Sequence, residues 1–166
     1  MSALEGRHVL VAGVREPDGR ALAVAIAEAG AAVSVTTRTA ELAEEVTANS
    51  ILNECWTFGR EGRALTLDLT DPAAVADALD NLEADLAPLD AVVTPLPPAE
   101  AVDVLASAAA ERMAARGSGV VVLPGPVEGA EALRAEWGDR GVVVVSTGAP
   151  EDIVAALTEA LATQRF

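Results

Sequence analysis

Apolar residues along this chain fall into short continuous runs, separated by longer segments in which they recur every three or four positions. Runs such as Val120–Leu123 and Val142–Val145 contain no polar residue, which is typical of strands buried on both faces of a parallel sheet. Strands are predicted over residues 8–13, 32–37, 63–68, 90–94, 119–123 and 141–146. Helices are predicted over residues 18–29, 40–58, 72–86, 98–116, 128–138 and 150–163.

Strands and helices alternate strictly, with short polar joints between them. This order predicts the α/β class, with a doubly wound parallel sheet of about six strands and helices on both faces, as in Rossmann-like folds. Pro72 and Pro150 are each expected just inside the start of a helix, with Asp71 capping the first of these helices. No repeat, linker or low-complexity segment interrupts the pattern, so residues 1–166 are expected to form one domain.

The loop between the first strand and the first helix has the layout of a phosphate-binding loop. In such loops glycines let the backbone approach a pyrophosphate at the N-terminus of a helix, where amide donors and the dipole favour anions. Gly13 and Gly19 bracket the loop, but Pro17 lacks an amide hydrogen, and Glu16 and Asp18 place negative charge where the anion would lie. The loop therefore indicates the ancestry of the chain more clearly than its present function.

Several further segments, in order along nearly the whole chain, resemble the short-chain dehydrogenase/reductase family. The stretch from Ala12 to Gly19 stands where that family has Thr-Gly-x-x-x-Gly-Ile-Gly, with the same spacing to Gly30 at the end of the helix. The other matching segments are Asp68-Leu69-Thr70-Asp71, Leu89–Val93, Met113–Gly119 and Arg140–Val144. The resemblance implies a nucleotide site at Gly13 and Gly19, with Asp68 and the neighbouring Leu69 at the adenine.

The departures from the family fall on the walls of its active site. Thr94-Pro95-Leu96-Pro97 replaces the family's Asn-Asn-Ala-Gly, and helix 98–116 carries no match for the catalytic asparagine. The expected serine position falls around Leu123-Pro124-Gly125, and the Tyr-x-x-x-Lys helix is missing because the chain has no tyrosine. The family's final strand and substrate lid are also expected to be absent. Without these groups no general acid or base serves hydride transfer, so no catalytic residue is assigned.

Two interpretations of nucleotide binding remain open. Arg38 follows the second predicted strand, where the family often places an arginine for the 2′-phosphate of NADP, and Arg15 could approach the same phosphate. A pair of guanidinium groups suits a phosphate, but Glu16 and Asp18 can neutralise both arginines in surface ion pairs. No cofactor is expected, and NADP is the alternative.

Two helices are candidates for contact with a partner. Helix 98–116 is rich in alanine, and the resemblance implies that the equivalent helix contributes to a dimer interface. In the first half of helix 40–58, Leu42 and Val46 are expected to face the sheet, with Glu41, Glu44 and Glu45 between and around them. The second half carries two apolar stripes, formed by Ile51, Cys55 and Phe58 and by Leu52 and Trp56. Two stripes mean either burial against the edge of this domain or contact with a partner. Both alternatives remain open.

Composition narrows the classes of partner. The formal net charge is −15 and the pI is near 4.2, so the surface should repel nucleic acid and anionic lipid. No apolar stretch has the length of a membrane span, and the N-terminus lacks the layout of a signal peptide. One cysteine and one histidine exclude an internal disulfide and make a metal site unexpected. His8 is expected to be a structural or surface histidine, Cys55 a buried inert thiol, and the protein cytoplasmic.

The preferred hypothesis is a non-catalytic subunit that assembles with itself, or with an active full-length relative, through helices 98–116 and 40–58. The alternative is an NADP(H)-binding oxidoreductase component or sensor whose missing active-site wall comes from a partner chain.

Overall fold

The computed structural model describes residues 3–13, 19–37, 39, 41–94, 102–124, 130–147 and 150–164. Their strands are β1 (His8–Val11), β2 (Ala32–Thr37), β3 (Ala64–Thr66), β4 (Ala91–Val93), β5 (Gly119–Pro124) and β6 (Val142–Thr147). Their helices are α1 (Gly19–Glu28), α2 (Leu42–Trp56), α3 (Pro72–Asp85), η1 (Val102–Ala106), α5 (Ser107–Arg116), α6 (Ala130–Trp137), η2 (Gly138–Arg140) and α7 (Pro150–Thr163). No helix among these residues is long and apolar enough to cross a membrane.

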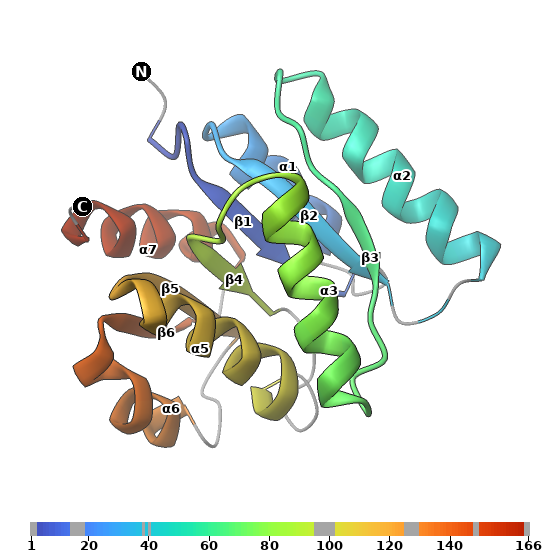
Figure 1. Cartoon of the computed structure of the whole chain (residues 1–166). Coiled ribbons are helices and arrows are strands. Elements are labelled where there is room, and N and C mark those ends of the chain that lie inside the picture. Colours follow the sequence, from blue (N-terminus) through green and yellow to red (C-terminus); the bar gives the residue numbers. More distant parts are fainter. Residues whose placement is uncertain are drawn as a thin grey trace.

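The six strands form one parallel sheet in the order β3-β2-β1-β4-β5-β6. The chain winds outward from β1 to β3, then crosses back to β4 on the other side of β1 (Figure 1). Ligands of such sheets bind beyond the carboxyl ends of the strands at this point of reversal. The predicted fold class is confirmed, and each predicted strand overlaps an observed one.

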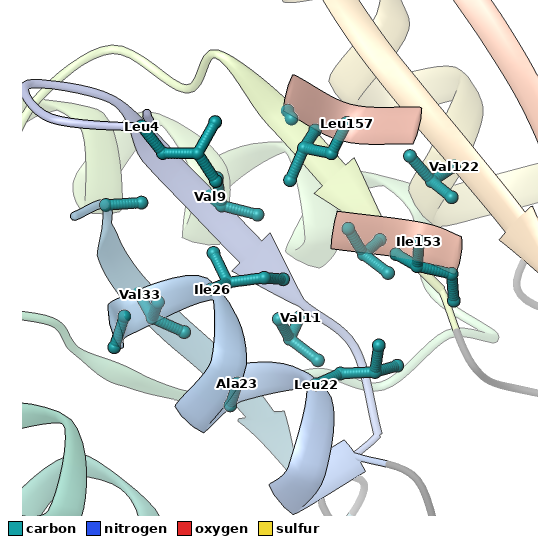
Figure 2. Close-up of a cluster of buried hydrophobic side chains, with 14 of the residues drawn as sticks. Leu4, Val9, Val11, Leu22, Ala23, Ile26, Val33, Val122, Ile153 and Leu157 are labelled. Atoms are coloured by element: carbon teal, nitrogen blue, oxygen red, sulfur yellow. The ribbon is translucent and has the colours of Figure 1, made fainter. Parts of the chain in front are cut away.

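Alternating side chains of each strand enter two separate cores. One face of the sheet packs against α1, α2 and α7, with Val9 and Val11 of β1 on this side. Figure 2 shows these two valines among Leu22 and Ile26 of α1 and Leu157 of α7. The other face takes Leu10 of β1 and packs against α3, α5 and α6. Burial on both faces explains why the strands are continuously apolar in sequence.

The predicted helix starts at the two prolines are confirmed. Pro72 is the first residue of α3, and the Asp71 carboxylate accepts a hydrogen bond of 3.1 Å from the amide of Ala74. α7 begins at Pro150. The prediction of one continuous helix over residues 98–116 was wrong in part, because Val102–Ala106 forms a π-helix that leads into α5. Residues 98–101 lie outside the described part of the chain.

The prediction that Leu42 and Val46 face the sheet was wrong. These side chains are 74% and 57% exposed, and the buried face of α2 instead consists of Glu44, Ala48, Ile51 and Cys55. Those four positions are spaced by four, three and four residues, so they share one side of the helix. Because Ile51 and Cys55 fix the rotation of the helix against the sheet, Glu44 is carried inward and Leu42 outward.

The second apolar stripe of α2 is only partly covered by this domain, and Phe58 at the end of the first stripe is exposed as well. Trp56 is 69% exposed and Phe58, just beyond the helix, is 41% exposed. Leu52 is half-buried against the core. Burial on the domain's own edge therefore does not account for Trp56.

Candidate functional site

The carboxyl end of β1 is held by contacts with both neighbouring strands. Gly13 has a φ of +87°, which side chains rarely permit, and its amide donates a hydrogen bond of 2.9 Å to Oγ1 of Thr36 in β2. The preceding amide, of Ala12, donates to the carbonyl of Val93 in β4 over 2.9 Å. Gly19 is buried as the first residue of α1. The two predicted glycines therefore bracket the loop as expected, while Arg15, predicted to bind NADP, lies outside the described residues.

The end of β2 is joined to β3, beside the position predicted for the 2′-phosphate. The hydroxyls of Thr37 and Thr66 are 3.0 Å apart, and the amide of Leu67 donates to the carbonyl of Thr37 over 2.9 Å. Arg38, predicted to hold the phosphate, lies outside the described residues.

Glu44 brings a buried carboxylate to this end of the sheet. Its Oε2 accepts a hydrogen bond of 3.0 Å from the amide of Thr39 and a second one from the Thr39 hydroxyl. The side chain is only 2% exposed. Sequence analysis missed Glu44, although its spacing from Ala48 and Ile51 was the signal that could have found it.

Asp68 and Leu69 follow β3, as the resemblance requires. Oδ1 of Asp68 accepts hydrogen bonds from the amide of Thr70 at 2.9 Å and from its hydroxyl at 2.5 Å. These two hydrogen bonds lower the pKa of the Asp68 carboxyl, and no donor among the described residues reaches Oδ2. The exposed, ionised carboxylate can therefore still accept an amino group. Leu69 is half-buried against the core.

Thr94 directly follows β4, next to the point where the sheet order reverses. Its amide donates to the carbonyl of Val122 in β5 over 3.0 Å. Its hydroxyl is buried and has no partner among the described residues, which is uncommon for a buried polar atom. Sequence analysis treated Thr94 only as a replacement for the family's asparagine and did not identify this group. Residues 95–101 lie outside the described part.

The single histidine lies at the opposite end of the sheet. Nδ1 of His8 is 2.8 Å from the carbonyl of Ala87, and Nε2 is 2.9 Å from the hydroxyl of Ser34. Burial lowers the pKa of His8, against smaller opposing effects of Ala87 and nearby carboxylates. The predicted structural role is confirmed.

The single cysteine is also buried within the fold. Burial, with a smaller contribution from Glu54, raises the pKa of the Cys55 thiol to about 11, so the thiol is unreactive at neutral pH. Across the described ranges, no group of three His, Cys, Asp or Glu side chains is arranged to hold a metal ion.

The connection from β5 to β6 is short. β5 ends at Pro124, α6 spans Ala130–Trp137, and β6 begins at Val142. Residues 125–141 contain no serine, tyrosine or lysine. Leu133 and Trp137 of α6 are buried in the core. In the resembling family, the same connection carries the serine and the Tyr-x-x-x-Lys helix.

Comparisons with known proteins agree with this arrangement. Residues 7–95, more than half of the chain, match the sequence model of the family described as short chain dehydrogenase. The chain therefore belongs to the short-chain dehydrogenase/reductase family.

Curated relatives match a little over half of the chain. The 3-oxoacyl-[acyl-carrier-protein] reductase FabG of Salmonella typhimurium is 33% identical over 91 residues, which cover 55% of this chain and 34% of the reductase. The match thus spans about a third of the length of that relative.

Solved structures extend the likeness in fold to nearly the whole chain. A short-chain type dehydrogenase/reductase from Mycobacterium marinum superposes with a TM-score of 0.77 and 20% identity, covering 96% of this chain and 91% of that one. A gluconate 5-dehydrogenase from Burkholderia cenocepacia, in complex with NADP and tartrate, superposes with a TM-score of 0.72 and 22% identity. This match covers 87% of this chain and 72% of that one. At these identities the likeness shows the fold alone.

Proposed function

We propose that this chain is a non-catalytic short-chain dehydrogenase/reductase-like subunit. It assembles in the cytoplasm with itself or with an active full-length relative, and it stabilises or regulates the assembly. The connection between β5 and β6 is the observation that carries this proposal, because residues 125–141 lack every side chain type that serves as proton donor in the family. This connection is internal, so the argument does not depend on where the chain begins or ends.

Carbonyl reduction needs a group that gives a proton to the oxygen as hydride reaches the carbon. The described carboxyl ends of the strands offer threonine hydroxyls, at Thr36, Thr37, Thr66 and Thr94, beside the carboxylates of Glu44 and Asp68. An unassisted hydroxyl is a poor acid, and the only histidine lies at the far end of the sheet. All eleven basic residues are arginine, so no lysine can lower the pKa of a neighbouring hydroxyl.

The structure supports an assembly role through α5 and α2. α5 is tied to α3, since Arg112 donates to the carboxylate of Asp80 over 2.6 Å and to the carbonyl of Ala76 over 2.7 Å. Its exposed positions include Ala115, whose small side chain allows another helix to approach closely. The exposed Trp56 offers an aromatic anchor of the kind favoured at interfaces.

An activity assay tests the absence of catalysis. NADPH oxidation by the purified chain should equal the buffer rate with ketone and thioester substrates, while the Salmonella reductase serves as the positive control. Turnover that survives repurification, and that Thr94→Ala or Arg38→Ala changes, would overturn the non-catalytic assignment because contaminants would not respond to these substitutions.

A second candidate function is NADP(H) binding without catalysis. Gly13 and Gly19 are retained on either side of the loop. The Oδ2 atom of Asp68 has no donor among the described residues and could accept a hydrogen bond from an adenine amino group. Arg15 and Arg38 match the arginines that bind the 2′-phosphate elsewhere in the family. The gluconate 5-dehydrogenase of similar fold was solved with NADP. Against binding stand Pro17, which has no amide donor, and the negative charge of Asp18.

Calorimetric titration distinguishes the two candidates. If the site is retained, NADPH binds more tightly than NADH, Arg38→Ala removes the preference, and Arg140→Ala, on the far edge of the sheet, leaves it unchanged. If neither nucleotide binds, the combined change Pro17→Gly and Asp18→Ile should create affinity, because it restores an amide donor and removes a repelling charge.

A further inference from the structure

The outward face of α2 carries an apolar stripe that none of the described elements covers. Leu42, Val46 and Trp56 lie on it, with Asn49 and Asn53 between them, at spacings of four, three, four and three residues that keep all five on one side of a helix. We call these five residues the outer α2 stripe. Figure 1 shows α2 on the outside of the molecule, beside the edge strand β3.

The flank of α2 that faces β3 is hollowed at both ends. Near the start of the helix, Glu45 and Asn49 line a hollow of about 280 Å³ together with Thr66 of β3. Near its end, Trp56 lines a second hollow of about 300 Å³ with Arg63.

Charge is segregated by sign along this flank. Glu41 and Glu45 lie at the N-terminal half of α2, and Arg60 and Arg63 lie beside its C-terminal half. Glu61 falls between the two arginines, so the basic end keeps a net charge of about one. None of these five side chains forms an ion pair within the described residues. Unpaired charges of opposite sign thus stand at opposite ends of one exposed apolar stripe.

We propose that the outer α2 stripe binds the same stripe of a second copy of this chain, with the two α2 helices antiparallel. This rests on the proposed function as an assembling subunit, and it names the partner and the surface. A two-fold axis beside Asn49 sets Leu42 of one copy against Trp56 of the other. Asn49 then meets its own copy.

The same axis matches the charged flanks. A two-fold rotation keeps the β3 flanks of both helices on one side of the pair, so the acidic half of each copy faces the basic half of the other. In this arrangement Glu45 of one copy lies opposite Asn53 of the other copy. Arg63 of that other copy lines the same hollow as its Asn53, so it lies near Glu45. The surface is therefore self-complementary in the placement of its apolar and charged residues, as an isologous interface requires.

The size of the surface predicts a weak dimer. A helix of 15 residues presents a contact about 22 Å long, which places the interface at the small end of specific ones. The net charge of −15 on each copy also opposes association. We therefore expect a monomer–dimer equilibrium that depends on protein concentration.

Sedimentation velocity of the full chain over a wide range of concentrations tests the surface. The wild type should shift from monomer to dimer, whereas Trp56→Asp and Leu42→Asp should remain monomeric. Ala43→Asp, which adds the same charge one position off the stripe, should dimerise like the wild type. Circular dichroism confirms folding, which we expect because both stripe residues are largely exposed.

A charge-exchange experiment tests the antiparallel register. Glu45→Arg alone and Arg63→Glu alone should each weaken the dimer by placing like charges across the axis. An equimolar mixture of the two variants should restore association, since each position then faces its opposite sign in the heterodimer. A mixture that associates no better than either variant would overturn the register.

The remaining outcomes are distinct from those of the proposed function. A wild type that stays monomeric at every concentration, or a dimer insensitive to Trp56→Asp and Leu42→Asp, overturns the pairing of α2 helices. A monomer that binds a full-length relative through α2 overturns the second copy as partner but leaves the subunit function intact. Activity in the NADPH assay would overturn the non-catalytic function without affecting the interface.

Discussion

At the scale of residues, one buried network links three strands at the amino end of the sheet. The carbonyl of Ala87 can only accept a hydrogen bond, so Nδ1 of His8 carries the proton and donates to it. Nε2 then accepts from the Ser34 hydroxyl, whose oxygen also accepts from the amide of Arg63 over 3.1 Å. The neutral imidazole therefore satisfies every partner, and a second proton on the ring would break this arrangement.

The direction of the His8 pKa shift predicts how stability depends on pH. Because burial lowers the pKa of His8 below 6.5 in the folded state, the unfolded chain binds more protons once the pH falls below about 6.5. The free energy of unfolding should then decrease toward acid pH, by up to about 1.4 kcal/mol per pH unit from this group. Well above a pH of about 6.5, His8 is neutral in both the folded and the unfolded state, so it adds no pH dependence to the free energy of unfolding.

Denaturant unfolding of the wild type and of His8→Gln between about pH 5 and pH 8 measures this effect. The glutamine variant keeps a polar side chain but has no titrating group, so the difference between the two curves isolates His8. Parallel curves through this range would contradict the assignment.

At the scale of elements, short contacts position the helices on the sheet. Gly62 precedes β3, and a Cβ at this position would lie 1.6 Å from the carbonyl oxygen of Val33 in β2. The backbone must therefore approach closely where β3 joins the sheet. Gly138, in η2, has open space around the corresponding position.

Substitution of these two glycines should differ strongly in cost. Gly62→Ala forces the edge strand away from β2 and should lower the free energy of unfolding by about 2 kcal/mol or more. Gly138→Ala meets no neighbouring atom and should change it by less than about 0.5 kcal/mol. Chemical denaturation of both variants checks this, and equal effects would show that β3 is not held by this contact.

The cap of α3 gives a second prediction for an element. Asp71→Ala removes the acceptor for the amide of Ala74 and should cost about 1 kcal/mol of unfolding free energy. Asp71→Asn should keep most of the stability because its amide oxygen can accept the same hydrogen bond. Asp77→Ala removes an exposed carboxylate from the same helix and serves as the control. A loss no larger than that of Asp77→Ala would contradict a capping role.

At the scale of the whole molecule, 26 acidic residues against 11 basic ones leave a charge of −15 on a small folded body. Such a charge repels itself more strongly in the compact state than in the unfolded chain. Helix contacts such as that between Arg112 and Asp80 offset only part of this repulsion.

Salt should therefore stabilise the fold. We expect the melting temperature to rise as ionic strength increases toward about 1 M, where the screening length shortens to about 3 Å. Sodium and potassium chloride should give the same curve if screening is the cause. A melting temperature that falls with salt would indicate that the attractive ion pairs outweigh the net repulsion.

Part of the candidate site could be predicted from the sequence alone. Gly13 and Gly19 could be placed at a strand end and a helix start because local spacing encodes these positions, whereas Asp68 was named through the resemblance of its segment to the family. Thr36, Glu44 and Thr94 were missed. Thr36 matters because it accepts from Gly13, 23 positions earlier in the chain, and no local pattern carries such a contact.

The sequence by itself determined the elements, their order and the α/β class, because strands buried on both faces and helices with one buried stripe leave distinct periodicities in a chain. It also placed the departures from the family at the active-site walls. Only the tertiary structure decided which side of α2 is buried, because the helix carries two apolar stripes and only one of them can pack fully against the sheet. Ile51 and Cys55 fit the core formed with α1 and the sheet, so the helix rotated to bury them. That rotation drew Glu44 inward and left Leu42, Val46 and Trp56 exposed to solvent.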